Sequence, residues 1–115
     1  MKILITRPLQ QSRRFAETLV KQFGKNLEIC ASPVLEIKFF KVEIKLNSFD
    51  GLIFTSESGV RAFSNLNQQS EKKVYCVGAY TSEIARKSGL SVTHTEKNVE
   101  SLKTWLIEND AEKRL

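Results

Sequence analysis

The sequence is poor in the residues that build metal centres and disulfide frameworks. Among its 115 residues are two cysteines, Cys30 and Cys76, and a single histidine, His94. These do not form a set with metal-ligand spacing, and no Ser-His-Asp combination is recognisable. Each cysteine lies in a short apolar run, "LEICA" or "VYCVG", so we predict buried, reduced thiols in strands. His94 has no catalytic partner at a readable spacing, and we predict a surface residue at a strand end.

Signals for nucleotide loops, export and membrane insertion are also absent. Neither G-x-x-x-x-G-K nor G-x-G-x-x-G occurs in the chain. The start, "MKILITRP", has one lysine and a three-residue apolar run, which is too little for a signal peptide. No apolar stretch approaches the length of a membrane span. We therefore predict a cytoplasmic protein that does not interact with a membrane.

The charge balance is basic, with 18 Lys and Arg against 13 Asp and Glu, a formal net charge of +5. This excess favours an anionic partner, and a merely solvated basic surface is the alternative. No block of basic residues is longer than two, and the aromatic residues are mostly Phe in apolar patterns. A nucleic-acid partner is therefore not expected.

The first part of the chain has the pattern of a βαβ unit. The apolar run Ile3-Leu4-Ile5 predicts a buried strand, and residues 10–23 carry apolar side chains at helical spacing up to Gly24. Residues 27–31 predict a second strand. A strand, helix and strand in this short span favour a parallel pair with a crossover helix.

Residues 40–46 alternate apolar and charged side chains, which predicts a strand with one wet face, a connector or an edge strand. It divides the chain into residues 1–37, a connector at 38–47 and residues 48–115. Bodies of about 60 residues bury only about 60% of their unfolded surface, so the first piece is too small to hold a core alone. We expect that something docks on it or is missing from it.

The remaining residues alternate again between strand and helix patterns. The fold class predicted is α/β, with a parallel sheet built from βαβ units. Asn98 is expected to cap the last helix, with Val99, Leu102, Trp105 and Leu106 facing inward. The predicted elements are strands at 52–54, 74–77 and from Val92, helices at 59–66, 81–88 and from Val99, a polar loop at 65–73 and a patternless charged end at 108–115.

Two strand-to-helix turns, "IFTSESGV" and "CVGAYTSEI", share a design. In parallel α/β folds ligands bind at the carboxyl ends of strands, where first-turn N–H groups and hydroxyls form a seat for anions. Each helix N-terminus contributes only about 0.3–1 kcal/mol, so several are needed. The alternative is that the hydroxyls are simple caps and the glycines permit tight turns. The candidate residues are Ser56, which comes first, with Ser58, Gly59, Gly78 and Thr81.

Two further residues lie at such turns. Arg7 follows the first strand and precedes Pro8, where its guanidinium could clamp a carboxylate bidentately; a plain surface arginine is the alternative. Tyr80 either lines the same cleft or packs against it.

Four blocks in order carry a family resemblance: "ILITRP", "FDGLIFTSESGVRAF", "VYCVGAYTSEIARKSGL" and "NVESL". Together they resemble the uroporphyrinogen-III synthase family. The resemblance implies a two-lobed α/β fold, with connecting strands between the lobes and the active site in the cleft. Family members are much longer, so it also implies a truncated member that holds the first βαβ of one lobe, the connector and the first half of the other lobe.

The resemblance further implies a reaction. The family takes hydroxymethylbilane, inverts ring D through a spiro intermediate and closes the macrocycle with loss of water, without cofactor or metal. The substrate is a polycarboxylate, and catalysis resembles the holding of a flexible chain more than acid–base chemistry. Ser56 and Thr81 match family hydroxyls that line the cleft, and Arg7, Gly59 and Gly78 lie where substrate carboxylates are expected. The alternatives are a non-catalytic remnant or a tetrapyrrole-binding module, with self-association or a complementing fragment covering exposed apolar faces.

Overall fold

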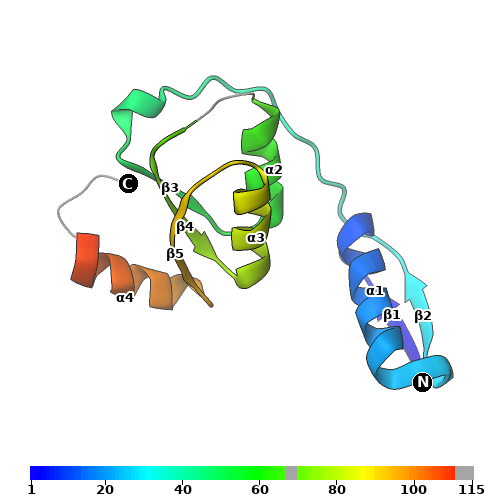
Figure 1. Cartoon of the computed structure of the whole chain (residues 1–115). Coiled ribbons are helices and arrows are strands. Elements are labelled where there is room, and N and C mark those ends of the chain that lie inside the picture. Colours follow the sequence, from blue (N-terminus) through cyan, green and yellow to red (C-terminus); the bar gives the residue numbers. More distant parts are fainter. Residues whose placement is uncertain (67–69, 111–115) are drawn as a thin grey trace. The chain divides into compact units, whose positions relative to one another are not determined.

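The computed structural model describes residues 1–66 and 70–110 (Figure 1). The chain divides into two compact units, Met1–Lys38 and Phe39–Leu115, and each is described by itself. The predicted polar loop at 65–73 and the predicted charged end at 108–115 fall partly on residues outside the described ranges.

The first unit is a βαβ unit, as predicted. It consists of β1 (Lys2–Ile5), α1 (Leu9–Phe23), a 3-10 turn η1 (Gly24–Asn26) and β2 (Glu28–Ala31). The two strands are parallel, with Ile5 opposite Ala31. Helix α1 ends at Gly24, whose φ of 75° favours glycine.

Only one face of this strand pair is well covered. Ile5 is buried, whereas Leu4, which points to the opposite face, is 63% exposed. Cys30 lies opposite Leu4 in the ladder and is exposed. The prediction of a buried thiol was therefore wrong for Cys30, because the single helix of this unit covers one face of the pair and leaves the other open.

The predicted strand at 40–46 does not form. Residues 32–45 make no β-ladder with any described residue, and a 3-10 turn, η2 (Leu46–Ser48), follows. The prediction failed because a strand needs a neighbour to pair with its N–H and C=O groups. Only the last two apolar positions of this segment, Ile44 and Leu46, lie against the core of the second unit, whereas Phe40 and Val42 are exposed.

The second unit is a three-layer α/β fold. Its parallel sheet has the order β3-β4-β5. Helices α2 and α3 pack on one face, and α4 covers the other (Figure 1). The predicted α/β class with a parallel sheet and alternating β–α units is confirmed. The elements are β3 (Gly51–Phe54), α2 (Glu57–Asn65), β4 (Lys73–Val77), α3 (Ala79–Lys87), β5 (Val92–Glu96) and α4 (Val99–Asp110).

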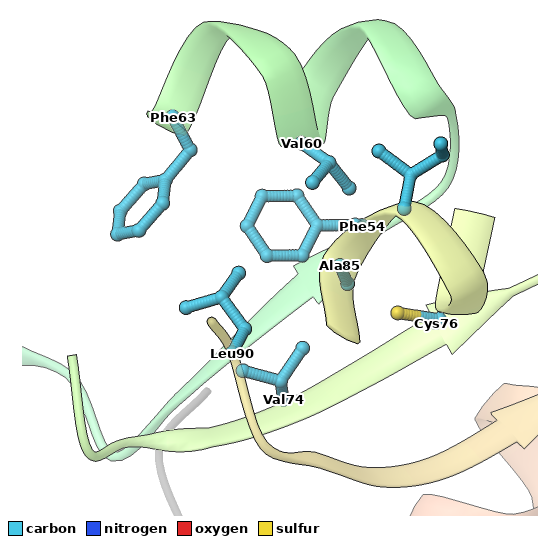
Figure 2. Packing of buried hydrophobic residues seen from close by; sticks show 8 residues of the cluster. Phe54, Val60, Phe63, Val74, Cys76, Ala85 and Leu90 are labelled. Carbon is cyan, nitrogen blue, oxygen red and sulfur yellow. The ribbon is translucent and has the colours of Figure 1, made fainter. Parts of the chain in front are cut away.

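The core of this unit lies between the sheet and helices α2 and α3 (Figure 2). Phe54 and Phe63 pack edge to face with ring centroids 5.7 Å apart. Cys76 lies opposite Phe54 in the ladder and is fully buried, as predicted. Its burial raises the pKa of the thiol, and the nearby charge of Arg86 offsets part of this rise.

The opposite face of the sheet is closed by α4. Asn98 caps this helix as predicted, since its Oδ1 accepts a hydrogen bond from Ser101 N at 2.8 Å. Leu102 is buried against the sheet, but Val99 is 57% exposed and does not face inward. That expectation was wrong because Val99 is the first residue of the helix, where the fold offers no buried position.

Candidate functional site

The carboxyl edge of the second unit's sheet gathers three helix N-termini. Each of the strands β3, β4 and β5 is followed directly by a helix, and because the strands are parallel all three turns lie at one edge. The helices that begin there are α2, α3 and α4 (Figure 1). Sequence reasoning singled out the first two turns as a site. The third carries the same strand–cap–helix pattern, which could have placed it there too.

The turn before α2 is a capped helix start. Ser56 has extended backbone angles, and its Oγ accepts a hydrogen bond from Gly59 N at 3.2 Å. A Cβ on Gly59 would meet Ser56 Oγ at 3.6 Å, which is ordinary contact. Ser58 is half-buried, and within the described residues its hydroxyl makes no hydrogen bond. Ser56 therefore caps α2, and its role as a ligand contact stays a prediction.

A buried carboxylate also lies in this turn. Glu57 is only 8% exposed, and its Oε2 lies 3.4 Å from Nη2 of Arg61, one turn further along α2. A negative charge in the first turn already complements the helix dipole, so the N-terminus of α2 attracts a second anion less. Sequence reasoning missed Glu57, although an acidic residue at the first helical position followed by Arg four residues later was a usable signal.

The turn before α3 differs from the turn before α2. Gly78 has φ 91° and ψ 138°, a conformation that L side chains rarely adopt, so glycine is required here. Thr81 is 7% exposed, and its hydroxyl makes no hydrogen bond among the residues that the structure describes. Its Oγ1 lies 3.8 Å from the position of a Cβ on Gly78. The first turn of α3 holds no acidic residue and no side-chain cap. No carboxylate of the first turn therefore offsets the positive end of the helix dipole, and the Thr81 hydroxyl is unused among the described residues.

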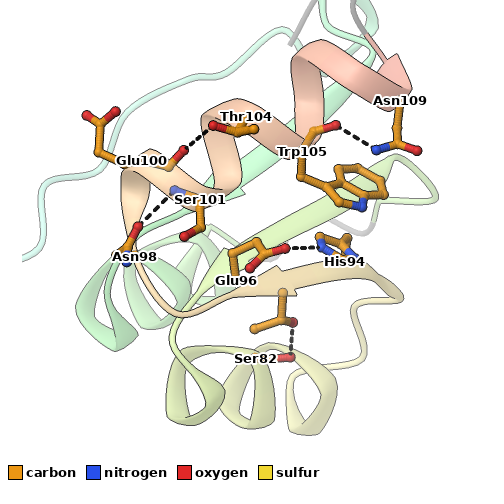
Figure 3. A network of polar contacts seen from close by, with 10 residues as sticks. Ser82, His94, Glu96, Asn98, Glu100, Ser101, Thr104, Trp105 and Asn109 are labelled. Atoms are coloured by element: carbon orange, nitrogen blue, oxygen red, sulfur yellow. Dashed lines mark hydrogen bonds and ion pairs between the residues drawn. The ribbon is translucent and has the colours of Figure 1, made fainter.

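The carboxyl end of β5 adds a polar network that sequence reasoning missed (Figure 3). His94 Nε2 lies 2.8 Å from Glu96 Oε1, and the imidazole stacks on Trp105 with centroids 3.9 Å apart and planes 9° apart. The prediction of a surface residue at a strand end was therefore wrong, because His94 lies in the middle of β5 and is half-buried. A signal was present, because residues i and i+2 of a strand share a face.

Tyr80 and Arg7 complete the predicted set. Tyr80 lies in the first turn of α3 and is 38% exposed. Arg7 belongs to the first unit, where it follows β1 and is exposed. Its carbonyl accepts a hydrogen bond from the buried Ser12 Oγ at 2.6 Å, and its guanidinium forms no ion pair within the described part of the chain. The other candidates, Ser56, Ser58, Gly59, Gly78 and Thr81, are brought to one sheet edge of the second unit.

Metal-binding groups and membrane-spanning helices were sought among the described residues of both units. Across residues 1–66 and 70–110 no group of three or more His, Cys, Asp or Glu is arranged to hold a metal ion. No described helix is long and apolar enough to cross a bilayer.

Fold and site thus define a parallel α/β protein with helix N-termini gathered at one sheet edge. Residues 14–115 match the family described as HEM4, uroporphyrinogen-III synthase HemD. The chain belongs to this family, which confirms the resemblance found in the sequence. It is also 34% identical over 94 residues to a protein of Methanocaldococcus jannaschii named "Putative uroporphyrinogen-III synthase". That match covers 76% of this chain and 38% of the relative, so the chain spans well under half of that protein's length.

Proposed function

We propose that this chain is a uroporphyrinogen-III synthase-like protein of haem biosynthesis, located in the cytoplasm. As a cyclising lyase it would act on hydroxymethylbilane, invert ring D and close the macrocycle with loss of water, without a cofactor. Membership of the family supports the proposal. The structural observation that carries it is the α3 turn, where a buried hydroxyl without a partner meets an uncapped helix N-terminus.

The α3 turn is suited to a substrate carboxylate. First-turn N–H groups and the Thr81 hydroxyl can all donate hydrogen bonds to it, and bonds to a charged acceptor are stronger than neutral ones. No acidic residue of the first turn competes. In this proposal Thr81 is the principal contact, Gly78 lets the backbone approach, and Ser58 supplies a second hydroxyl from the neighbouring turn. Ser56 and Gly59 shape that turn.

The first unit offers a similar seat. Helix α1 has no acidic residue in its first turn and no side-chain cap at Pro8, and Arg7 directly precedes it with an unpaired guanidinium among the described residues. We propose that Arg7 binds a carboxylate, because a planar guanidinium binds carboxylates bidentately. The proposed catalysis consists of holding a flexible tetrapyrrole by several carboxylates in a conformation that favours ring inversion.

Product analysis tests the activity. Freshly made hydroxymethylbilane is mixed with the purified chain, and the type I and type III isomers are separated after oxidation to porphyrins. The proposal expects type III product from the wild-type chain and less of it from Thr81→Val, with Thr93→Val on the exposed part of β5 as the matched control. Only the spontaneous type I isomer, in every sample, would contradict the enzymatic proposal.

A second candidate is a tetrapyrrole-binding module without catalysis. The observation that favours it is that the chain spans 38% of the relative's length. Binding of uroporphyrin I, followed by fluorescence anisotropy of the porphyrin, together with no type III product, would select this candidate. Addition of a fragment that supplies the remaining length of the relative tests whether activity needs complementation.

Exposed apolar side chains support self-association as a further proposal. Leu4 is 63% and Ile53 43% exposed, each on a sheet face of its own unit. Burial of such residues between two copies would remove apolar surface from water. Size-exclusion chromatography with light scattering is expected to give twice the chain mass, and a monomer at all concentrations would contradict this.

A further inference from the structure

The end of β5 is tied to the first turn of α3 by two hydrogen bonds. Gly78 N donates to the carbonyl oxygen of Glu96 at 2.8 Å. Thr95 Oγ1 donates to Ser82 Oγ at 2.9 Å (Figure 3). In the first bond α3's N-cap residue donates to β5, and in the second β5 donates to α3. Both ends of this helical turn are therefore anchored to the end of β5.

These anchors enclose the turn that carries Thr81. Ser82 N donates to the carbonyl oxygen of Gly78 at 3.2 Å, which closes the first helical turn between the two anchored residues. Ser82 is 1% exposed, so its hydroxyl has no access to water as a substitute partner. Thr81, which precedes it, has no hydrogen bond of its own hydroxyl among the described residues. The backbone that carries Thr81 is therefore anchored on its amino side at Gly78 and on its carboxyl side at Ser82.

We propose that Thr95 is a positioning residue for carboxylate binding at the N-terminus of α3. This inference rests on the proposed function, in which that N-terminus binds a substrate carboxylate. A donor that is held in place before the ligand arrives loses less conformational freedom on binding. Thr95 does not touch the ligand in this account; it holds Ser82, and through Ser82 it holds Thr81 and the first-turn N–H groups.

Replacement of Thr95 by valine keeps the shape and β-branching of the side chain and removes the hydroxyl. We expect the dissociation constant of uroporphyrin I to rise about fivefold to tenfold, as for the loss of one hydrogen bond. Thr95→Ser keeps the hydroxyl and is expected to bind within about twofold of the wild type. Thr93→Val makes the same chemical change on the same strand at an exposed position, and is expected to leave binding unchanged.

Binding is measured by anisotropy of the porphyrin, with the unfolding midpoint of each variant recorded alongside so that every titration uses folded protein. Amide hydrogen exchange supplies a second readout, in which Thr95→Val is expected to speed exchange of the Ser82 amide selectively. Wild-type affinity in Thr95→Val, or equal weakening in the valine and serine variants, overturns the positioning role and leaves the proposed function standing. No binding of uroporphyrin I by the wild type overturns both.

Discussion

The Thr81 hydroxyl could serve as a ligand contact or as a structural group of the fold. The substitution Thr81→Val distinguishes these two roles. The side chain is 7% exposed, and its hydroxyl finds no acceptor or donor within the described residues. Burial of a hydroxyl without a hydrogen bond costs about 1–3 kcal/mol by protein mutational data. Valine has nearly the same shape and no polar group. We therefore expect Thr81→Val to raise the free energy of unfolding by about 1 kcal/mol.

The same substitution is expected to weaken ligand binding. A hydrogen bond to a charged acceptor contributes about 1.5–3 kcal/mol, which corresponds to about a tenfold to hundredfold higher dissociation constant for uroporphyrin I. Stability and affinity would thus move in opposite directions, which a purely structural hydroxyl cannot produce. Thr81→Ser keeps the hydroxyl and serves as the control for affinity.

Urea unfolding followed by fluorescence of Trp105, the single tryptophan of the chain, reports on the second unit. With a slope of about 1–2 kcal/mol per molar urea, a gain of 1 kcal/mol moves the midpoint upward by about 0.5–1 M. A midpoint that falls by that amount would show that the hydroxyl is satisfied within the fold, and the argument for an open seat would be refuted. Unchanged affinity in Thr81→Val would refute the ligand contact itself.

Three further predictions concern the turn before α2 and the two thiols. Ser56→Ala should lower the free energy of unfolding by about 1 kcal/mol, because the Gly59 N–H loses its acceptor; Ser58→Ala is the control, and an equal loss there would contradict the cap. The raised pKa of Cys76 means that the unfolded chain releases this proton first as pH rises, so stability should fall above about pH 9 with a slope of at most about 1.4 kcal/mol per pH unit. In Cys76→Ala the urea midpoint between pH 7 and 10.5 should no longer show this pH dependence. If the dependence remained in this variant, another titrating group would be its cause. With a thiol reagent at pH 8, Cys30 should react at once and Cys76 only on unfolding, as the exposure of the first and burial of the second require; two equally fast thiols would contradict the packing of β4.

Much of the fold could be predicted because apolar periodicity reports on burial within an element. The sequence pattern correctly predicted three features: the strand at residues 52–54, the helix that precedes Gly24 and the cap at Asn98. The failures at residues 40–46 and at Cys30 share one cause, which is that periodicity within an element does not say which other element pairs with it or covers it. Residues 40–46 alternate, but no described strand pairs with them. Cys30 lies in an apolar strand whose outer face is open.

The candidate site was predictable in place but not in detail. Ser56 and Thr81 look alike in the sequence, as hydroxyl residues that follow a strand and open a helix. The structure separates them, since the Ser56 oxygen is occupied by a backbone N–H whereas the Thr81 hydroxyl is buried and unused among the described residues. This difference depends on the direction of each side chain and on neighbouring residues from β5. Neither can be predicted from the apolar periodicity of the sequence.

Charge in the first helical turn then selects among the N-termini of the second unit. The first turn of α2 carries Glu57 and that of α4 carries Glu100, while that of α3 carries no acidic residue. Because an anion gains only about 0.3–1 kcal/mol from one helix N-terminus, a carboxylate already in the turn removes much of what a ligand could gain there. Thr81→Glu would place such a charge in the α3 turn, and it should abolish binding of uroporphyrin I far more completely than Thr81→Val. If the two variants bound uroporphyrin I equally well, the open charge of this turn would have no part in recognition, and the assignment of the carboxylate to α3 would have to be given up.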